Sequence, residues 1–451
     1  MSFTFIALAA TAAIAVLVAV LLLQQRRTPQ STLAWLMALT LLPHFAVPLF
    51  LLFGFRKRGS GFRTISYTRP DQSAAMVAPL DALFRHFGLP AATRGNRVEL
   101  LSDPVLCWEA TVTLIEGAEE RLDAIFYVVE DDAVGRAFIE LLTARVRDGV
   151  RVRIMVDWIG GFRGPTRALK EFRKAGGKIR YFSPLLHLPE RGHLNLRNHR
   201  KMIMADGARL IAGGRNIGSH YMGPVARDDH WIDLSFLLEG PAVQSYADVF
   251  RADWSMGRQN GTVSHRAVAQ APAGDNIAQL VPSGPDSRFD PLHDALVNAI
   301  HAARSRVWIA TPYFIPTEHL EKALSTAARK GVDVRVMLPR TSNQRLADAA
   351  RGPYIRALEG TGARLLFVEG AMMHGKMGVV DEAAWVGSAN FDVRSMLLNF
   401  ESALVLYDAP KVGELAAWFE ELQKRCSEGV PRAGVLRRTF EGLFRLGAPM
   451  L

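Results

Sequence analysis

Two long uncharged stretches open the chain before any alternation of apolar and polar residues begins. They run from Phe3 to Leu23 and from Thr32 to Phe55, and each is long enough to cross a bilayer as a helix. A cleaved signal peptide is the alternative for the first stretch, but no basic segment precedes it and a second stretch follows. We therefore predict a transmembrane hairpin over residues 1–58, in which Pro43 and Pro48 could kink the second helix or make it re-entrant. More basic residues follow the second stretch than lie between the two, which places the larger C-terminal part in the cytoplasm.

Beyond residue 104 the pattern changes, because apolar runs of strand length alternate with amphipathic helical stretches. The succession of strand, helix, glycine turn and strand occurs twice. The first copy comprises residues 121–129, 132–147 and 150–156, and the second comprises 306–314, 318–329 and 332–338. Another helix and another strand follow in each copy. This succession predicts an α/β fold with two similar halves, each containing a sheet that helices cover on both faces.

The remaining stretches set the expected domain limits. The predicted units are a linker at 59–103, a first half at 104–255, an inter-half linker at 256–280, a second half at 281–428 and a tail at 429–451. The inter-half linker contains glycine, alanine and proline and few large apolar residues. The tail is amphipathic and could lie on a membrane, although packing against the body is its more ordinary role.

One polar motif occurs once in each half. It reads His-x-Lys, then four residues and Asp, followed downstream by two small residues, one variable residue and Asn. The two sets are His199, Lys201, Asp206 and Asn216 in the first half, and His374, Lys376, Asp381 and Asn390 in the second. A single His-x-Lys is most often an ordinary surface feature. Two sets at equivalent places of a repeat indicate a chemical role instead.

These residue types suit a phosphate group. Lysine offers a point charge to a phosphoryl oxygen, asparagine offers amide donors, and histidine can attack or carry a proton near neutral pH. We expect Asn216, Ser388 and Asn390 to bind phosphate. Asp206 and Asp381 complete the catalytic motif, but they lie at the turn that ends the strand, which favours a structural role. Neither a metal nor a cofactor is predicted, because the lysines and asparagines can neutralise the phosphoryl oxygens themselves.

A histidine that attacks phosphorus needs a group that holds its ring. Asp233 follows the first motif and Glu401 follows the second at a similar distance along the chain. We therefore predict that Asp233 orients His199 and that Glu401 orients His374, each within its own half. A pseudo-two-fold axis would then bring both histidines to opposite sides of one phosphorus.

Composition narrows the possible partners and the compartment. The chain is 49% hydrophobic and 22% charged, which excludes a disordered or fibrous class, and its formal net charge is +10. A basic chain suits an anionic membrane surface or a nucleic acid, and charge alone does not choose between them. The two cysteines, Cys107 and Cys426, are far apart and predict neither a disulfide framework nor a zinc site.

The two motifs resemble the paired HKD motifs of the phospholipase D superfamily, and of its bacterial cardiolipin synthases in particular. The residues that carry this resemblance are 198–201, 213–217, 387–392, 394–395, 399–401 and 445–451. The resemblance implies two phospholipase D-like α/β/α sandwich halves related by pseudo-two-fold symmetry. It also implies a phosphatidyltransferase of the bacterial inner membrane that makes cardiolipin and glycerol from two phosphatidylglycerol molecules. By resemblance, His199 is the nucleophile that forms a phosphatidyl-histidine and His374 is the general acid.

Other functions remain open at this point. Hydrolysis of phospholipids shares the covalent step with transfer, so the motif does not separate the two. A nuclease on the same fold suits the positive charge, but the predicted hairpin argues against nucleic acid as a partner. Residues 372–373, Gly375 and the loop 341–344 depart from what the family suggests, which leaves the acceptor lipid open. Trp231 and residues 313–314 could line an acyl channel, although a place in the core is favoured. The oligomeric state is not indicated.

Overall fold

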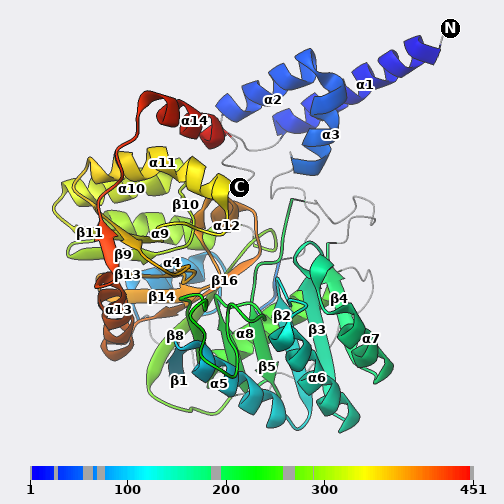
Figure 1. The fold of residues 1–451 in the computed structure, drawn as a ribbon, viewed down its shortest axis with the longest axis vertical. Coiled ribbons are helices and arrows are strands. Elements are labelled where there is room, and N and C mark those ends of the chain that lie inside the picture. The colour runs from blue at the N-terminus through cyan, green and yellow to red at the C-terminus, as the bar shows by residue number, and fades with distance from the viewer. Residues whose placement is uncertain are drawn as a thin grey trace.

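The structure is a computed structural model that describes residues 3–24, 29–53, 64–68, 77–183, 195–256, 270–287 and 289–446 (Figure 1). Most of the predicted inter-half linker lies outside the described residues, as do the basic residues of the loop and flank of the predicted hairpin and the last residues of the tail. The rest of the chain forms a body with a large central sheet. Three helices at the N-terminus extend away from this body (Figure 1).

The described body contains one 15-stranded sheet. The strands of the first half are β1 (Thr93–Leu101), β2 (Arg121–Phe126), β3 (Arg151–Asp157), β4 (Lys178–Phe182), β5 (Met202–Ala205), β6 (Arg209–Gly213) and β7 (Ser235–Glu239). Those of the second half are β8 (Asn276–Ser283), β9 (Arg306–Ala310), β11 (Asp333–Pro339), β12 (Arg364–Val368), β13 (Met377–Val380), β14 (Ala383–Gly387), β16 (Glu401–Leu406) and β17 (Cys426–Glu428). A separate pair joins β10 (Phe314–Ile315) to β15 (Phe391–Asp392) in parallel.

Strand order shows that the two halves are built alike. From one edge to the other the order is β4-β3-β2-β5-β6-β7-β1, and then β8-β16-β14-β13-β9-β11-β12-β17. The second series repeats the first in reverse, with β17 added at the far edge. The halves meet where β1 and β8 pair antiparallel, with Asn96 opposite Asn276. The predicted α/β fold with two similar halves is thus confirmed, and the pseudo-two-fold axis passes between these two strands.

Helices cover both faces of the sheet. The helices of the body are α4 (Pro79–His86), α5 (Pro104–Glu116), α6 (Ala133–Arg147), α7 (Thr166–Lys174), α8 (Val243–Ser255), α9 (Pro291–Ala302), α10 (Glu318–Arg329), α11 (Arg345–Glu359), α12 (Val393–Leu397) and α13 (Ala409–Gln423). The sequence explains their limits. Asp132 accepts a hydrogen bond from the Gly135 amide at the start of α6, Thr317 accepts one from Leu320 at the start of α10, and Gly331 follows α10 with φ +86°.

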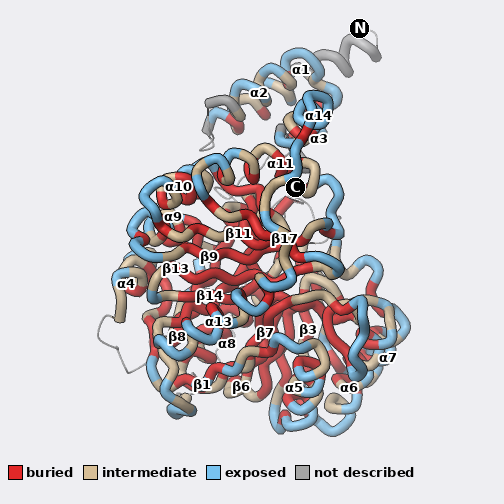
Figure 2. The backbone as a smooth tube through the Cα atoms, turned by 60° about the vertical axis from the view of Figure 1, so that its left-hand side comes forward, coloured by how far each residue is buried: buried red, intermediate tan, exposed pale blue. Residues whose placement is uncertain are grey.

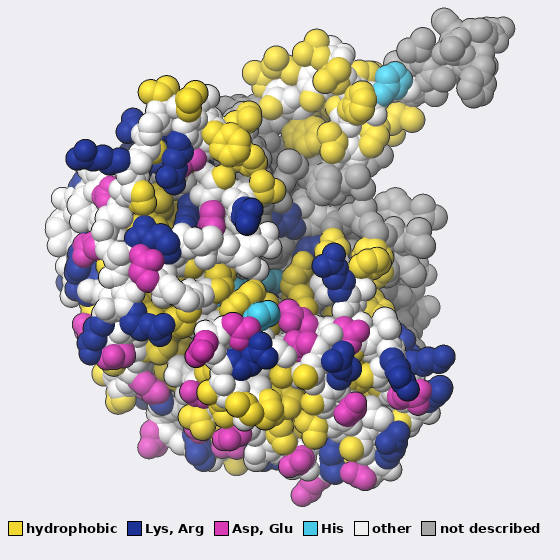
Figure 3. All heavy atoms as spheres, in the orientation of Figure 1, with side chains coloured by type: hydrophobic (Ala, Val, Ile, Leu, Met, Phe, Trp, Pro, Cys, Tyr) yellow, Lys and Arg dark blue, Asp and Glu magenta, His cyan; other side chains and the backbone are white. Residues whose placement is uncertain are grey.

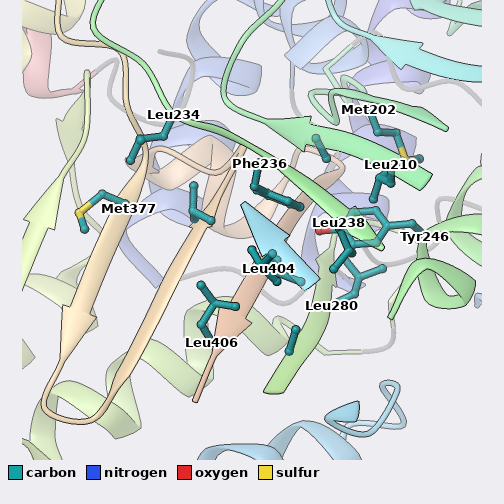
Figure 4. Packing of buried hydrophobic residues seen from close by; sticks show 14 of the residues in the cluster. Met202, Leu210, Leu234, Phe236, Leu238, Tyr246, Leu280, Met377, Leu404 and Leu406 are labelled. Carbon is teal, nitrogen blue, oxygen red and sulfur yellow. The ribbon is translucent and has the colours of Figure 1, made fainter. Parts of the chain in front are cut away.

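The core lies in layers on either side of the sheet, and buried strands alternate with exposed helix surfaces in Figure 2. One apolar cluster packs α5, α6 and α7 on the first half, and another packs α9, α10 and α11 on the second. A third is shared by both halves beneath α8 and α13, where Phe236 and Met202 lie in one cluster with Met377 and Leu404 (Figure 4). Burial of each such side chain contributes about 1.5–3 kcal/mol. The shared cluster therefore holds the two halves together.

The N-terminal region differs from the prediction. It forms α1 (Phe3–Gln24), α2 (Pro29–Leu41) and α3 (Pro43–Phe53), so the predicted second span is two short helices. Pro43 is the cause, because proline disfavours a helical conformation in the residue before it and so ends α2. Within the described ranges, we find no helix whose length and apolar character would let it cross a bilayer. The predicted transmembrane hairpin is therefore not supported.

The stretch 59–103 contains more structure than a linker. Its last part, Thr93–Leu101, forms β1, which pairs with β7 on one side and with β8 on the other. Local sequence could not show this, because the partners of β1 lie far along the chain. At the other end, the predicted tail forms α14 (Val435–Leu446), and Glu441 of this helix pairs with Arg356 of α11 at 2.5 Å.

Candidate active site

The two histidine motifs occupy equivalent places in the sheet. His199 and Lys201 lie in an extended stretch that leads directly into β5, and His374 and Lys376 lead into β13. β5 pairs with β2 and β6, and β13 pairs in the same way with β9 and β14. Extended residues two positions apart face the same side, so each lysine accompanies its histidine.

Backbone pairing joins each motif to the opposite half. Asn198 forms a parallel bridge with Phe400, and the amide of His199 donates to the Phe400 carbonyl at 2.9 Å. In the other half Met373 forms a parallel bridge with Ile232, and the amide of His374 donates to the Ile232 carbonyl at 2.7 Å. These bridges place His199 beside the residue that precedes β16, and His374 beside a residue of the segment that leads into β7.

The bridges correct the predicted partners of the histidines. Nδ1 of His199 lies 3.0 and 3.1 Å from the two carboxylate oxygens of Glu401, and Nδ1 of His374 lies 2.6 Å from Asp233. Asp233 and Glu401 therefore contact the histidine rings as expected, but each holds the ring of the other half. The pairing within each half was wrong because the bridge partner, rather than distance along the chain, decides which ring a carboxylate reaches. Each ring thus receives its carboxylate from the other half, and Lys376 of the same half also lies 2.8 Å from Nδ1 of His374.

Lys201, His374 and Lys376 are buried, and His199 keeps 14% of its side chain exposed. Burial lowers the pKa of Lys201 to about 7 and that of Lys376 to about 8. Burial also lowers the pKa of both imidazoles, and each ring is affected by the lysine of the opposite motif as well as by its own. The two motifs therefore share one electrostatic site. With Nδ1–H donated to a carboxylate, a neutral ring leaves its Nε2 lone pair free.

The carboxylates keep their charge in spite of burial. Burial acts to raise the pKa of Asp233, but Lys376 and His374 outweigh it and lower the pKa to about 2. Burial likewise acts against ionisation of Glu401, yet His199 and Lys201 hold its pKa below the ordinary value. Each ring nitrogen is thus paired with an anion that can stabilise an imidazolium.

The residues predicted to bind phosphate differ in what their side chains contact. Oδ1 of Asn216 accepts from the Val128 amide at 3.1 Å, and Nδ2 donates to the Tyr221 hydroxyl at 3.2 Å. The hydroxyl of Ser388 donates to Glu401 and accepts from an amide at 3.0 Å. Ser388 is therefore engaged in holding the carboxylate, which corrects its expected phosphate contact. Oδ1 of Asn390 is buried without a hydrogen-bond partner among the described residues.

The aspartates that end the motifs support the backbone. Asp206 accepts hydrogen bonds from the amides of residues 119, 120 and 121, at 2.8 to 2.9 Å. Asp381 accepts from the amides of residues 304, 305 and 306 in the same manner. Both residues have positive φ, at 55° and 49°. The structural role that the turn position favoured therefore fits these contacts, whereas no contact of either aspartate with a histidine or lysine of the motifs is recorded among the described residues.

Aromatic rings lie against both histidines, and sequence reasoning largely missed them. The ring of Tyr127 lies 5.1 Å from that of His199, between centroids. Tyr221 and Trp231 lie 5.6 and 5.1 Å from His374. Trp231 was expected in the core, but it borders the site. Phe314 is buried against Phe391 as expected. The sequence offered one signal for Tyr127, which was its place directly after a strand, at the edge of the sheet where the motifs lie.

A buried ion-pair network fixes the residue between His199 and Lys201. The guanidinium of Arg200 donates to Asp253 at 2.7 Å and to Asp286 at 2.8 Å, and all three side chains are buried. Asp286 follows β8 in the second half, so this network also joins the halves. As for metals, no group of three or more His, Cys, Asp or Glu gathers into a metal-binding arrangement in the part of the chain that the structure describes.

Comparison with known proteins agrees with this architecture. The family model described as "Cardiolipin synthase, PLD-like domain" matches residues 111–254 and again 296–423. A second, described as "Phospholipase_D-nuclease N-terminal", matches residues 12–54. Cardiolipin synthase 1 of Bacillus cereus is 30% identical over 460 residues, covering 95% of this chain and 90% of the relative. A cardiolipin synthase of Listeria monocytogenes is 30% identical over 435 residues, covering 90% of each chain.

Solved structures share the fold at low sequence identity. A phosphatidylserine synthase of Haemophilus influenzae aligns with a TM-score of 0.61 at 14% identity, covering 82% of this chain and 100% of that one. A polyphosphate kinase of Porphyromonas gingivalis aligns with a TM-score of 0.51 at 12% identity, covering 78% of this chain and 53% of that one. The duplicated domain match and the near full-length relatives together decide the classification. The chain belongs to the cardiolipin synthase family of phospholipase D-like proteins.

Proposed function

We propose that this enzyme transfers a phosphatidyl group between two phosphatidylglycerol molecules and so makes cardiolipin and glycerol. The observation that carries the proposal is the exchange of carboxylates, by which His199 is held by Glu401 and His374 by Asp233. Two imidazoles whose Nε2 atoms have no hydrogen bond within the described ranges, and which are both influenced by both lysines, suit attack on one phosphorus and protonation of its leaving group. The relatives named cardiolipin synthase support this choice among phosphoryl transfers.

In the first step Nε2 of His199 attacks the phosphorus of the donor lipid. The bond between phosphorus and the headgroup glycerol breaks, and Nε2–H of His374 gives its proton to the departing glycerol oxygen. The phosphatidyl group is now bonded to His199, whose ring carries a positive charge. Glu401, which is fully buried and contacts Nδ1, stabilises that charge.

In the second step neutral His374 accepts the proton of a headgroup hydroxyl from the second lipid. That oxygen attacks the phosphorus, and the bond between phosphorus and nitrogen breaks. The product carries four acyl chains, and both histidines return to their initial protonation states. Water in place of the second lipid would give phosphatidic acid, so exclusion of water from this step separates transfer from hydrolysis.

Lys201, Lys376 and Asn390 are proposed to bind the phosphoryl oxygens, and Asn216 to support them through its one remaining amide proton. Before substrate binds, burial and Lys376 keep the pKa of His374 low, so the ring is neutral. The phosphodiester brings a negative charge that opposes Lys376. Its binding therefore raises the pKa of His374, so that Nε2 takes up a proton from solvent and the ring becomes the acid of the first step.

The substrate also implies a membrane. We propose that the chain works at the surface of a bacterial inner membrane and that α1, α2 and α3 contribute to its attachment. Leu33, Leu41 and Phe45 of this region are 60%, 71% and 71% exposed, which is unusual for apolar side chains in contact with water alone. Residues 1–58 contain no acidic residue.

The test supplies purified full-length protein with phosphatidylglycerol labelled in its headgroup glycerol and presented in detergent. Release of labelled glycerol with a four-chain product supports transfer. Glycerol release with phosphatidic acid alone would establish hydrolysis and overturn the proposal. Cleavage of DNA without lipid turnover would overturn the lipid assignment.

The roles of the histidines need a separate measurement. His199→Ala is expected to abolish both turnover and the lipid–protein adduct, with an unchanged melting temperature. His374→Asn should still form the adduct slowly, because it lacks the acid but keeps the nucleophile. Peptide mapping after a rapid quench locates the adduct. An adduct on His374 in the His199→Ala protein would reverse the assignment.

A further inference from the structure

Helix α14 carries an apolar face that the body does not cover. Val435, Leu436, Phe440 and Leu443, here named the α14 apolar face, are 80%, 88%, 56% and 63% exposed. Their spacing places all four side chains within an arc of about 140° around the helix axis, so they share one side of the helix. An exposed apolar patch of this kind in a folded protein indicates a surface that binds a membrane or another protein.

The opposite side of α14 fixes the helix to α11. Glu441 is buried and pairs with Arg356 at 2.5 Å and with Arg437 at 2.8 Å. Gly352 of α11 lies so close that a Cβ there would collide with the Glu441 carboxylate. The guanidinium of Arg445 lies 4.8 Å from the ring centre of Tyr354. Because these contacts set the rotation of α14, its apolar face points away from the body.

The charge around the α14 apolar face has one sign. Glu441 is the sole acidic residue from 429 to 451 and is buried; one of its ion pairs runs to Arg356 of α11 and the other to Arg437 on α14 itself. The arginine side chains at 432, 437 and 438 lie in exposed or partly exposed positions beside the apolar side chains. Apolar side chains flanked by arginine suit an anionic lipid bilayer, whose interior is apolar and whose surface is negatively charged.

The position of α14 agrees with such a surface. Figures 1 and 2 both show α14 on the side of the molecule from which α1, α2 and α3 extend. Apolar side chains gather on that side in Figure 3, over α14 and over the N-terminal helices. Leu33, Met37 and Leu42 of the latter are 60%, 54% and 60% exposed. Two segments from opposite ends of the chain thus present apolar side chains on one side.

We propose that α14 is an interfacial helix that lies on an anionic phospholipid bilayer, with its apolar face among the acyl chains and Arg437 and Arg438 at the lipid phosphates. The inference rests on the proposed function, because that bilayer holds the substrate. A second copy of the chain fits less well as the occupant. It would bring the same arginines together, and four side chains bury far less than a stable dimer requires.

A fluorescent label tests the contact directly. Leu436→Cys in a Cys426→Ser background places one reactive thiol on the α14 apolar face, since Cys107 is buried. The full-length protein, labelled with a polarity-sensitive dye, is mixed with vesicles that contain phosphatidylglycerol or only phosphatidylcholine. The expected result is a blue shift with the anionic vesicles that high salt weakens. No shift with anionic vesicles, or a shift that grows with protein concentration in their absence, overturns the proposal.

Turnover provides the second test. The variant Leu436→Asp/Phe440→Asp should lose about tenfold or more in turnover on vesicles, since two buried side chains are replaced by charges. Its turnover in detergent micelles should equal that of the unchanged protein. Leu106→Asp on α5 is the matched control, because Leu106 is 58% exposed and α5 lies far from α14 (Figure 1).

The outcomes separate the two proposals. If the unchanged protein makes no cardiolipin in micelles or vesicles, the proposed function fails whatever the dye reports. If it makes cardiolipin and the double variant is as active on vesicles as Leu106→Asp, the assignment of α14 is overturned. An equal loss in micelles and vesicles would show that the substitutions act on the fold instead, and would also overturn the assignment.

Discussion

The replacement of Glu401 by Gln tests the exchange of carboxylates between the halves. Gln keeps the size of the side chain and removes its charge, and its amide can present N–H to a ring nitrogen that also carries a proton. Glu401 belongs to the half that contains His374. Since its carboxylate contacts His199 instead, we expect Glu401→Gln to slow formation of the phosphatidyl-histidine and to leave the acid intact.

The magnitude follows from the geometry. A carboxylate oxygen lies 3.0 Å from Nδ1 of His199, and Glu401 has no exposed side-chain surface. Two opposite charges about 4 Å apart interact by about 4 kcal/mol at an effective dielectric of about 20. Loss of that interaction with the phosphatidyl-imidazolium corresponds to about a thousandfold slower step. Ser388→Ala is the graded control, because it removes one hydrogen bond to Glu401, worth about 1 kcal/mol or roughly fivefold.

A substrate with an activated leaving group distinguishes the two carboxylates. Rapid-quench measurement follows adduct formation from phosphatidylglycerol and from a phosphatidyl ester of a nitrophenol, which leaves without protonation. Asp233→Asn weakens the acid, so the nitrophenyl ester should restore its rate. The same ester should not restore Glu401→Gln, which lacks support for the nucleophile. The reverse pattern of rescue, or a Glu401→Gln rate within fivefold of the unchanged enzyme, would refute the exchanged arrangement.

Three further outcomes are expected. Asp206→Ala should lower the free energy of unfolding by about 2–4 kcal/mol in urea titrations, because three backbone amides lose their acceptor. Turnover per folded molecule should stay unchanged. A large loss of turnover with normal stability would argue for a chemical role of Asp206. Lys201 is charged below its pKa of about 7, so KM for phosphatidylglycerol should rise as pH increases through about 7. Lys201→Arg should move that rise to higher pH. An identical pH profile in the variant would exclude Lys201 as the cause of the rise in KM. Arg200→Ala should lower the free energy of unfolding, measured by thermal unfolding, by about 3–5 kcal/mol, because Asp253 and Asp286 stay buried without a counter-ion. A decrease below about 1 kcal/mol would show that the network does not hold the halves together.

The repeating part of the fold was predictable because it depends on local patterns. Apolar runs and helical periodicity located the strand at 121–126, the helix at 133–147 and their counterparts at 306–310 and 318–329 to within a few residues. Turn residues marked where each helix ends. The two motifs could be recognised for a similar reason, since their residue types and spacing are properties of the chain alone.

The N-terminal region shows where such patterns mislead. Hydropathy summed over residues 32–55 favours one span, but a single residue, Pro43, divides the stretch into α2 and α3. β1 shows the opposite error, because its place at the centre of the sheet depends on β7 and β8, more than a hundred residues away. Neither the break between α2 and α3 nor the pairing of β1 follows from a hydropathy value averaged over neighbouring residues.

Residue types and spacing alone were enough to select the candidate site residues: two histidines, two lysines and two carboxylates in a repeated α/β unit. How these residues combine depends on the packing of the two halves. The bridges of Asn198 with Phe400 and of Met373 with Ile232 cross between the halves, and they turn two half-sites into one. The physical reason is that spacing along a chain fixes which face a side chain occupies, whereas its partner depends on strands that meet only after the two halves pack together.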